Sequence, residues 1–478
     1  MKKQLLVLSC IEGATVMAVE LCGARLLSPV FGSSLYVWAS VLGITLLALA
    51  SGYFTGGWWS AKSKDPAKRL FLILSFAALS VLLMPFTAEY LVPRIAYISF
   101  FPAMIGATVL LLFAPVFFLG ATSPLFVMLQ SKSQADAGKV SGGVYAISTL
   151  GGILATFGCG FYLMPQLGLK ITLLSFGILL FVSSALLLWK FLFTHALIAS
   201  GLVVLNLQSQ LKNQALLYLS EGIMGRVEVE DLNYNQKTIR LLKVNDIIQS
   251  EMDLATGQSV SEYVRVFDSL CSGFAPGSKA LVLGLGAGLT SNVLSDKKFQ
   301  VQAVEFDDRV IYAAQHYFGL DKKVKVFNDD ARHFLNANQT SYDLVLADVF
   351  KAEEQPSHVI TTESLSKLKT QLSKKARILI NWHGYSSGEL GKGTSILYHT
   401  LLKQGFHIKF CSYSNDEHHR NLMLVASLEK LPELAFEVHP DLEKTTLVNT
   451  DDQPLLEEAN ALANLSWRNL YLRHYTGQ

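Results

Sequence analysis

Charge is scarce in this chain, and the shortage is uneven. Charged residues make up 16% of the 478 residues, against roughly 25% in an average soluble protein. The deficit lies between Leu5 and Gln208, whereas the composition from Glu221 onward is that of an ordinary globular protein. A net charge of +2, with no basic run and no RNA-binding signature, argues against a nucleic-acid partner. The sequence therefore predicts a half built for lipid followed by a half built for water.

Paired cysteines and metal-ligand spacings are also lacking. The five cysteines show no paired spacing, which argues against a disulfide framework and against a zinc site. The histidines of the second half have no ligand spacing either, so no metal is expected. The N-terminus, MKKQLLVLSC, resembles the start of a signal peptide. Because Glu12 and Glu20 interrupt the apolar stretch and further apolar stretches follow, a retained first helix is the favoured interpretation.

Long apolar stretches dominate residues 1–210 and predict a polytopic helical membrane domain. Seven of them are long enough to cross a hydrocarbon core of about 30 Å: Leu5–Leu27, Leu35–Trp59, Leu70–Ala88, Ile95–Leu129, Gly142–Met164, Ile171–Trp189 and Phe191–Leu207. The fourth stretch is long for one crossing and contains Pro102, Pro115 and Pro124. A kinked helix, a tightly turned pair and a re-entrant segment all fit it, so seven or eight spans are expected.

The charges between the apolar stretches predict the orientation. The gap SAKSKDPAKR carries four basic residues, and Lys2 and Lys3 precede the first stretch. Basic connections favour the cytoplasmic side, so the N-terminus is expected in the cytoplasm of a multi-pass inner-membrane protein. Seven spans would place the second half outside the cytosol and eight would place it inside. The cofactor expected for the second half favours a cytoplasmic location of that catalytic domain.

Three ionisable residues, Glu12, Glu20 and Arg25, lie within or at the end of the first apolar stretch. Ionisable groups are costly in hydrocarbon and face a bundle interior or a cavity. Two interpretations stay open: a structural hydrogen-bonded or ion-paired cluster, and a polar pocket for a cationic or amphipathic substrate.

The stretch KALVLGLGAGLTSNVLSDKKFQVQAVEFDDRV predicts a strand, a glycine turn, a helix and a second strand. Gly284, Gly286 and Gly288 would let the backbone approach a ligand at the start of a helix. Glu305 follows 21 residues after the first glycine, where a carboxylate can bind both ribose hydroxyls. The dinucleotide pattern would need a third glycine at Leu289, so the turn fits folds that bind S-adenosylmethionine better.

Strands and helices alternate beyond the glycine turn and predict a Rossmann-like α/β domain over 257–430. Asp330 and Asp348 both follow apolar strands, at the edge where open α/β sheets bind ligands. Ahead of this domain, alternating runs flanking the turn-like NYNQ predict a small antiparallel β subdomain over 211–256. Residues 431–478 form a C-terminal tail.

These residues together resemble a known family, the spermidine synthases or polyamine aminopropyltransferases, and in particular their membrane-fused bacterial relatives. In the soluble part the resemblance covers roughly Glu221–Ala426 and rests on the order of VEFD, DDAR, LADVF and HVITTESL after the glycine turn. In the membrane part it rests on EGATVMAVELCGARLLSPVFGSSLYVWAS and GGVYAISTLGGILATFGCGF, and NTDDQP in the tail resembles a further family element.

The resemblance implies roles for individual residues. Glu305 would bind the ribose hydroxyls, Asp330 with Ala331 would contact the adenine, and Gln249 would lie against the nucleoside. Asp348 matches the acid that helps to remove a proton from the attacking amine. The implied co-substrate is decarboxylated S-adenosylmethionine, or S-adenosylmethionine itself.

The acceptor end departs from the family pattern. Ala287 and Lys351 stand where the soluble synthases have aspartates, and of the stretch before the first Rossmann strand only Tyr263 is kept. Putrescine as acceptor is therefore in doubt. The remaining candidates for acceptor binding are Tyr263, His383, Asp451 and Asp452.

Three functions follow as hypotheses. The first is a membrane-anchored aminopropyltransferase-like enzyme acting on a small amine or a membrane-associated acceptor. The second is a methyltransferase that uses intact S-adenosylmethionine. Ala287 favours it, because a carboxylate at that position would repel the carboxylate of this donor. The third is a transporter or sensor whose soluble domain binds a nucleoside without turnover. The lipid bilayer is the expected partner, and soluble relatives often form homo-oligomers.

Overall fold

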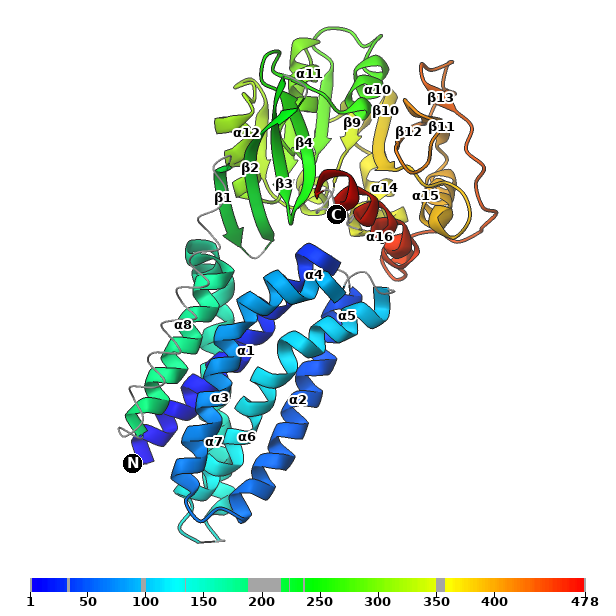
Figure 1. Cartoon of the computed structure of the whole chain (residues 1–478). Coiled ribbons are helices and arrows are strands. Elements are labelled where there is room, and N and C mark those ends of the chain that lie inside the picture. Colours follow the sequence, from blue (N-terminus) through cyan, green and yellow to red (C-terminus); the bar gives the residue numbers. More distant parts are fainter. Residues whose placement is uncertain are drawn as a thin grey trace. The chain divides into compact units, whose positions relative to one another are not determined.

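A computed structural model describes residues 2–31, 35–95, 100–133, 135–187, 216–222, 224–234, 237–349 and 357–476. The chain divides into two compact units, one made of residues 1–214 with 220–225 and the other of residues 215–219 with 226–478 (Figure 1). The described part of the first unit is helical through residue 187, and the second unit combines two sheets with helices.

The helical unit is a bundle in which α1 is central. Its helices are α1 (Lys2–Phe31), α2 (Leu35–Ala61), α3 (Pro66–Phe86), α4 (Val92–Ile95), α5 (Phe100–Thr108), α6 (Ala114–Gln130), α7 (Ala137–Gly158) and α8 (Met164–Leu187). Helix α1 packs against α2, α6, α7 and α8. Near its start, Leu5 shares an apolar cluster with Val144 of α7 and Leu180 of α8. Near its end, Leu27 shares another with Leu169 of α8, so α8 runs antiparallel to α7.

Three prolines of this bundle each follow a π-helical turn. Three single π-helical turns interrupt it: η1 (Thr87–Leu91), η2 (Val109–Phe113) and η3 (Cys159–Leu163). Each ends two residues before a proline, namely Pro93, Pro115 or Pro165. Proline has no N–H for the preceding turn and its ring crowds that turn, so the wider turn accommodates it without ending the helix.

Five helical stretches of the described chain are long and apolar enough to cross a membrane: Lys3–Ser28, Tyr36–Ala61, Pro66–Leu91, Pro102–Gln130 and Ala137–Ala185. The fourth is one continuous passage with a π turn, so the turned pair and the re-entrant segment that its length also allowed are wrong. The fifth breaks at Gly168, where the backbone is not helical, and contributes two antiparallel helices. The expected span Phe191–Leu207 lies outside the described residues.

In the second unit, the first sheet has five strands in chain order. They are β1 (Leu216–Gly222), β2 (Gly225–Tyr234), β3 (Lys237–Val244), β4 (Ile247–Asp253) and β5 (Gln258–Ser259). The pairs from β2 to β5 are antiparallel. Asn245 and Asp246, both left-handed, form the two-residue turn between β3 and β4, as expected for a tight hairpin. Val229 and Leu242 on the inner face pack with Ala287 of the glycine turn.

The second sheet has eight strands in the order β13-β11-β12-β10-β9-β6-β7-β8. The parallel part is β6 (Lys279–Leu283), β7 (Gln300–Glu305), β8 (Lys325–Asn328), β9 (Tyr342–Ala347) and β10 (Leu372–His383), and β11 (His407–Cys411), β12 (Asn421–Ser427) and β13 (Glu437–Val438) pair antiparallel. The alternation of strands and helices that the sequence predicts beyond the glycine turn is present. The strand order reverses between β6 and β9, which marks the edge where such sheets bind ligands.

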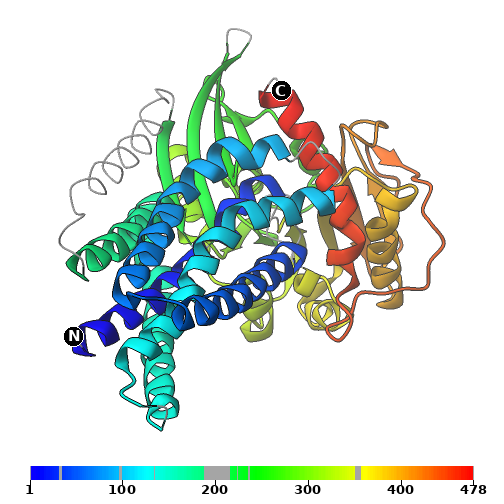
Figure 2. The same cartoon turned by 60° about the horizontal axis from the view of Figure 1, so that its bottom comes forward.

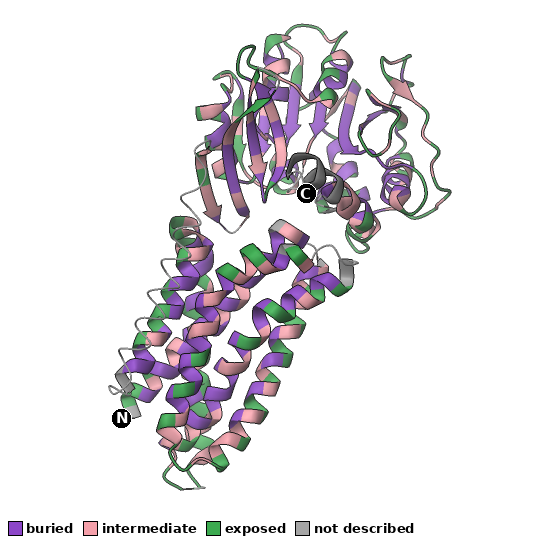
Figure 3. Ribbon diagram, viewed as in Figure 1, coloured by how far each residue is buried: buried purple, intermediate pink, exposed green. Residues whose placement is uncertain are grey.

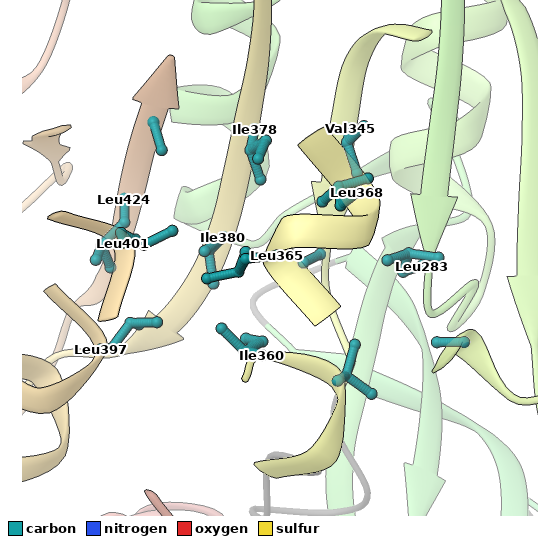
Figure 4. Packing of buried hydrophobic residues seen from close by; sticks show 14 of the residues in the cluster. Leu283, Val345, Ile360, Leu365, Leu368, Ile378, Ile380, Leu397, Leu401 and Leu424 are labelled. Atoms are coloured by element: carbon teal, nitrogen blue, oxygen red, sulfur yellow. The ribbon is translucent and has the colours of Figure 1, made fainter. Parts of the chain in front are cut away.

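Apolar clusters cover both faces of this sheet, because successive apolar side chains of its strands point to opposite faces. Leu283 of β6 and Ile380 of β10 point into one cluster with Leu365 of α14 (Thr362–Lys369) and Leu397 of α15 (Lys392–Lys403) (Figure 4). Neighbouring residues point to the opposite face, toward α10 (Glu262–Leu270) and α11 (Leu289–Asp296). Figure 3 shows the central strands as buried along most of their length. Strands covered on both faces read as continuous apolar runs.

The tail ends in a long helix, α16 (Leu455–Thr476), which packs against α15 (Figure 2). It is tied to the end of β10, since Tyr385 and Ser466 share a hydrogen bond of 3.0 Å. It also reaches the turn before β4, where Arg468 donates to the backbone oxygen of Asn245 at 3.2 Å. Helix α16 therefore links the carboxyl end of β10 to the small sheet.

Candidate active site

The glycine turn joins β6 to α11 and meets the end of β9. Gly284 has φ 87°, and a Cβ on it would lie 2.2 Å from the backbone oxygen of Asp348, so no other residue fits without moving that strand end. The amide of Asp348 in turn donates to Leu283 at 2.8 Å. Gly288, with φ 77°, precedes α11. The turn thus brings the end of β9 against the end of β6.

Glu305 ends β7 and is half-buried beside the glycine turn. Its two carboxylate oxygens accept hydrogen bonds of 3.0 Å from the backbone amides of Leu285 and Asp307. Burial raises the pKa of this carboxyl, although the two amides act in the opposite direction. Each oxygen keeps a second lone pair, so the residue can still accept hydrogen bonds from hydroxyl groups of a ribose.

Asp330 caps α13 (Ala331–Ala337). Its side chain accepts from the amides of Arg332 and His333 at 2.9 and 3.0 Å, and its other oxygen lies 3.2 Å from Nε2 of His358. Burial opposes ionisation, but the amide and imidazole contacts outweigh it and lower the pKa of Asp330. Ala331 follows as the first, buried residue of the helix. This part of the edge holds a fixed negative charge.

Asp348 follows β9 and is half-buried. Its Oδ1 accepts from Nδ2 of Asn381 at 2.8 Å and its Oδ2 from the hydroxyl of Tyr263 at 3.3 Å. Asn381 is itself oriented by Asn421, whose Nδ2 donates to its Oδ1 at 3.1 Å. Burial raises the pKa of Asp348 above the usual range of an aspartate. A carboxylate oriented in this way is a suitable proton acceptor.

A second acid, which the sequence alone did not single out, lies near Tyr263. Glu251 of β4 accepts a hydrogen bond of 3.3 Å from Ser261, which precedes α10. Burial, Asp348 and Glu251, in that order, raise the pKa of the Tyr263 hydroxyl well above 10, so this tyrosine stays a hydrogen-bond donor. Gln249 is two residues earlier on the same strand, at the bulge where β4 has one more residue than β3 between Ile248 and Ser250.

Only weak sequence patterns point to Glu251 and Asn381. Glu251 stands two positions after Gln249 in IIQSEMD, and a period-two search from Gln249 would have found it. Asn381 follows the apolar run of β10, two residues before His383, and a polar residue near the end of an apolar strand is a weak signal for a site.

His383 lies beneath α16. It is 5% exposed, and its Nε2 lies 2.9 Å from Oδ1 of Asn460 on that helix. Burial lowers the pKa of His383 to about 4. Its contact is therefore with the tail helix, and its role in acceptor binding stays a prediction.

The two tail aspartates differ from each other. Asp451 accepts from Thr361 at 2.6 Å and pairs with Arg332 at 2.8 Å, close to the Asp330 end of the site. Its charge is thus opposed by an arginine, although Asp451 is exposed in the same way as Asp452. Their roles toward an acceptor stay predictions.

Ala287, the departure within the glycine turn, is fully buried. Its methyl group packs in an apolar cluster with Val229, Leu242 and Met252, and its amide donates to Oγ of Ser250 at 3.2 Å. The position is therefore part of the contact with the small sheet, and a carboxylate there would have to be buried among apolar side chains.

Comparisons with known proteins give three sequence matches of note and no matching family model. The polyamine aminopropyltransferase of Vibrio vulnificus is 26% identical over 161 residues, 32% of this chain and 52% of the relative. Polyamine aminopropyltransferase 2 of Bacillus cereus is 23% identical over 261 residues, 47% of this chain and 71% of the relative. The N-terminal histidine N-methyltransferase of Emericella nidulans is 34% identical over 113 residues, 23% of this chain and 20% of the relative.

Solved structures give distant similarities. A probable spermidine synthase from Corynebacterium glutamicum has a TM-score of 0.39 at 18% identity, over 45% of this chain and 79% of that one. Human methyltransferase-like protein 13 in complex with SAH has a TM-score of 0.30 at 21% identity, over 43% and 92%. The chain spans about half the length of the Vibrio relative and less of the fungal one. In sequence, the chain is thus similar to polyamine aminopropyltransferases, which supports the resemblance to the spermidine synthase family.

Proposed function

We propose that this protein is a membrane-anchored aminopropyltransferase-like enzyme that uses decarboxylated S-adenosylmethionine and an amine acceptor. The observation that carries the proposal is the group around Tyr263, whose hydroxyl lies 3.3 Å from Asp348 and whose pKa is raised by both Asp348 and Glu251. Two carboxyl groups beside a tyrosine suit an acceptor that arrives as an ammonium ion and must lose a proton before it attacks.

The reaction places separate demands on the residues. The acceptor nitrogen forms a bond to the propyl carbon while the bond from that carbon to the sulfonium sulfur breaks, and a thioether nucleoside leaves. Asp348 takes the proton of the amine, held in place by Asn381. Glu305 and Asp330 hold the nucleoside. Because the acceptor and the donor are both cationic, the acids at this edge offset their repulsion.

Glu251 would recognise the ammonium form of the acceptor, in the place of the acids that the sequence lacks at Ala287 and Lys351. Glu251→Gln should raise KM for the amine about tenfold or more and leave donor affinity unchanged, because a charged hydrogen bond contributes about 1.5–3 kcal/mol. Glu262→Gln, at the exposed first position of α10, is the matched control. Unchanged KM in Glu251→Gln would remove this residue from the acceptor site.

A second candidate function is methyl transfer from intact S-adenosylmethionine. The burial of Ala287 among apolar side chains favours it, since no acid then stands in the turn to repel the carboxylate of that donor. The match to the fungal N-methyltransferase points the same way, although it covers 20% of that relative.

Calorimetry on the full chain in detergent separates the two functions. Preference for decarboxylated S-adenosylmethionine over the intact form supports aminopropyl transfer, and the reverse preference supports methyl transfer. Glu305→Ala should abolish binding of either donor. If neither donor binds the unaltered protein, the nucleoside site is wrong and the membrane half becomes the part to study for transport or sensing.

The membrane anchoring, a cytoplasmic catalytic unit and a homo-oligomeric state belong to this proposal as well. Anchoring is supported by the five long apolar helical stretches of the described chain. Reporter fusions at the C-terminus test on which side of the membrane the catalytic unit lies.

A further inference from the structure

An acid lies in the interior of the helical bundle. Glu12 is 2% exposed on α1, the helix that contacts most of the others. Oγ of Ser148 on α7 donates to its Oε2 at 3.0 Å, and within the described chain no Lys, Arg or His side chain forms an ion pair with it. A lone carboxylate in hydrocarbon is costly, so Glu12 needs a proton or a cation as partner.

The α1–α7 side of Glu12 is closed by backbone contact. A Cβ added to Gly13 would lie 2.0 Å from the backbone oxygen of Ser148, and one added to Gly151 would lie 2.0 Å from that of Cys10. The two helices touch through their glycines at both positions. No partner of any size can reach the carboxyl group from between them.

Two tyrosines at the surface of the bundle lie near the pair formed by Glu12 and Ser148. Tyr53 of α2 lies beside Tyr145 of α7. The two rings meet edge to face, with centroids 6.4 Å apart, and Tyr145 precedes Ser148 by one helical turn. Tyr53 and Tyr145 are 38% and 44% exposed, beside exposed apolar residues such as Phe54. The pair therefore lies one helical turn from the hydrogen-bond partner of Glu12, on a face that is exposed in the bundle.

We propose that Glu12, Ser148, Tyr53 and Tyr145 form a binding site for the ammonium group of a lipophilic amine, which enters from the lipid phase between α2 and α7. The carboxylate supplies the opposite charge, and the two ring faces attract a cation. The alkyl chain of such a ligand stays in hydrocarbon. A hydrophilic polyamine would have to bring further charges out of water and is excluded by that cost.

The test measures whether an amine shields Glu12. Dicyclohexylcarbodiimide modifies protonated carboxyl groups in apolar surroundings, and mass spectrometry of the full chain in detergent reports modification at Glu12. Dodecylamine should slow the modification in a saturable way, whereas dodecanol and spermidine should not. If dodecylamine has no effect, or if dodecanol protects equally, the site is not an ammonium site. Absence of any modification of Glu12 without amine would also overturn the proposal.

Variants separate the site from its surroundings. Tyr53→Leu and Tyr145→Leu should each weaken protection by dodecylamine about 2- to 30-fold, the range of a cation–π contact. Tyr162→Leu, at another exposed position of the bundle, should not change it. Equal protection in all three variants would show that the rings take no part. Glu305→Ala should leave protection intact, so this site and the proposed enzyme activity can fail independently.

Discussion

At the scale of single residues, Asp348 is the group whose chemistry can be isolated most cleanly. Asp348→Asn keeps an oxygen for Asn381 and a polar atom for Tyr263, so donor binding should persist. The rate of group transfer should fall about 10²- to 10⁴-fold, the contribution of a positioned base. Asp343→Asn, at the opposite end of β9, is the control and should keep its activity.

The pH dependence follows from the same burial. Because burial raises the pKa of Asp348, its carboxylate form is lost at a higher pH than for an ordinary aspartate near 3.9. Activity should therefore decrease as the pH falls through this raised pKa, and the residual activity of Asp348→Asn should lack this acidic limb. A variant that kept the same limb would assign it to another group, such as the acceptor amine.

At the scale of elements, the glycine turn and the strand ends could be predicted from sequence because their signals are local. The apolar run before Gly284, the helical pattern after it and the acids ending successive strands all fall within short windows, and parallel strands bring those ends to one edge. Glu251 and Asn381 could not be assigned in this way. The place of Glu251 depends on how the small sheet packs against the rest of the unit, and that of Asn381 depends on the pairing of β10 with β9 and β12.

The glycine turn offers a matched pair of substitutions. Gly284 and Gly277 have nearly the same backbone conformation, φ 87° and 89°, but a Cβ on Gly277 meets nothing within 4 Å. Gly277→Ala should cost about 1–2 kcal/mol of unfolding free energy, the penalty for a left-handed residue with a side chain. Gly284→Ala should cost at least about 2 kcal/mol more, because its Cβ displaces the backbone of Asp348.

Denaturant unfolding of both variants in detergent, with donor binding measured beside it, checks this comparison. Gly277→Ala should bind the donor normally, whereas Gly284→Ala should not. Similar losses in the two variants would mean that the close approach of Asp348 to the turn is not maintained in solution.

The docking of α16 could not be anticipated from local patterns either, since it depends on His383 meeting Asn460 across 77 residues of chain. The pKa of His383 falls from 6.5 to about 4 on burial. The unfolded chain therefore takes up a proton at higher pH than the folded one, so the stability present above pH 6.5 is lost as the pH falls toward 4. The difference, at 1.36 kcal/mol per pH unit, is about 3 kcal/mol.

Unfolding followed between pH 7 and pH 4 tests this contribution. His383→Gln should be less dependent on pH in that range, because it has no proton to gain, while the exposed His407→Gln should behave as the unaltered protein. If His383→Gln and the unaltered protein lose stability in parallel, His383 is not held neutral under α16.

At the scale of the whole molecule, the helical unit has two ends of unequal charge. Leu5 clusters with Leu70, Leu125 and Leu180, so the start of α1, the α2–α3 and α6–α7 connections and the end of α8 lie at one end. The basic residues of those connections gather there: Lys62, Lys64, Lys68, Arg69, Lys132 and Lys139. At the other end, Lys170 is paired with Glu89. The positive-inside tendency predicts that the first end is cytoplasmic.

This arrangement changes the number of spans expected before the second unit, and that number determines on which side of the membrane the unit lies. Since the fourth stretch is a single passage and α8 returns to the end that holds the N-terminus, the six passages through residue 187 bring the chain back to its starting side. Eight spans, which rested on a turned pair in the fourth stretch, are no longer needed for a cytoplasmic unit. A crossing by residues 191–207 would instead place that unit outside.

Reporter fusions decide between these outcomes and bear directly on the proposed reaction. If only the six passages cross, green fluorescent protein fused after Ser133 or at the C-terminus should fluoresce, because an even number of passages precedes each position. Alkaline phosphatase fused after Ile95 should be active, because three passages precede that position. Active phosphatase at the C-terminus would place the soluble unit outside the cytosol. The nucleoside donor is made in the cytosol and carries a charge that membranes exclude, so the proposed transfer would then lack its donor and the site around Glu305 would need another ligand.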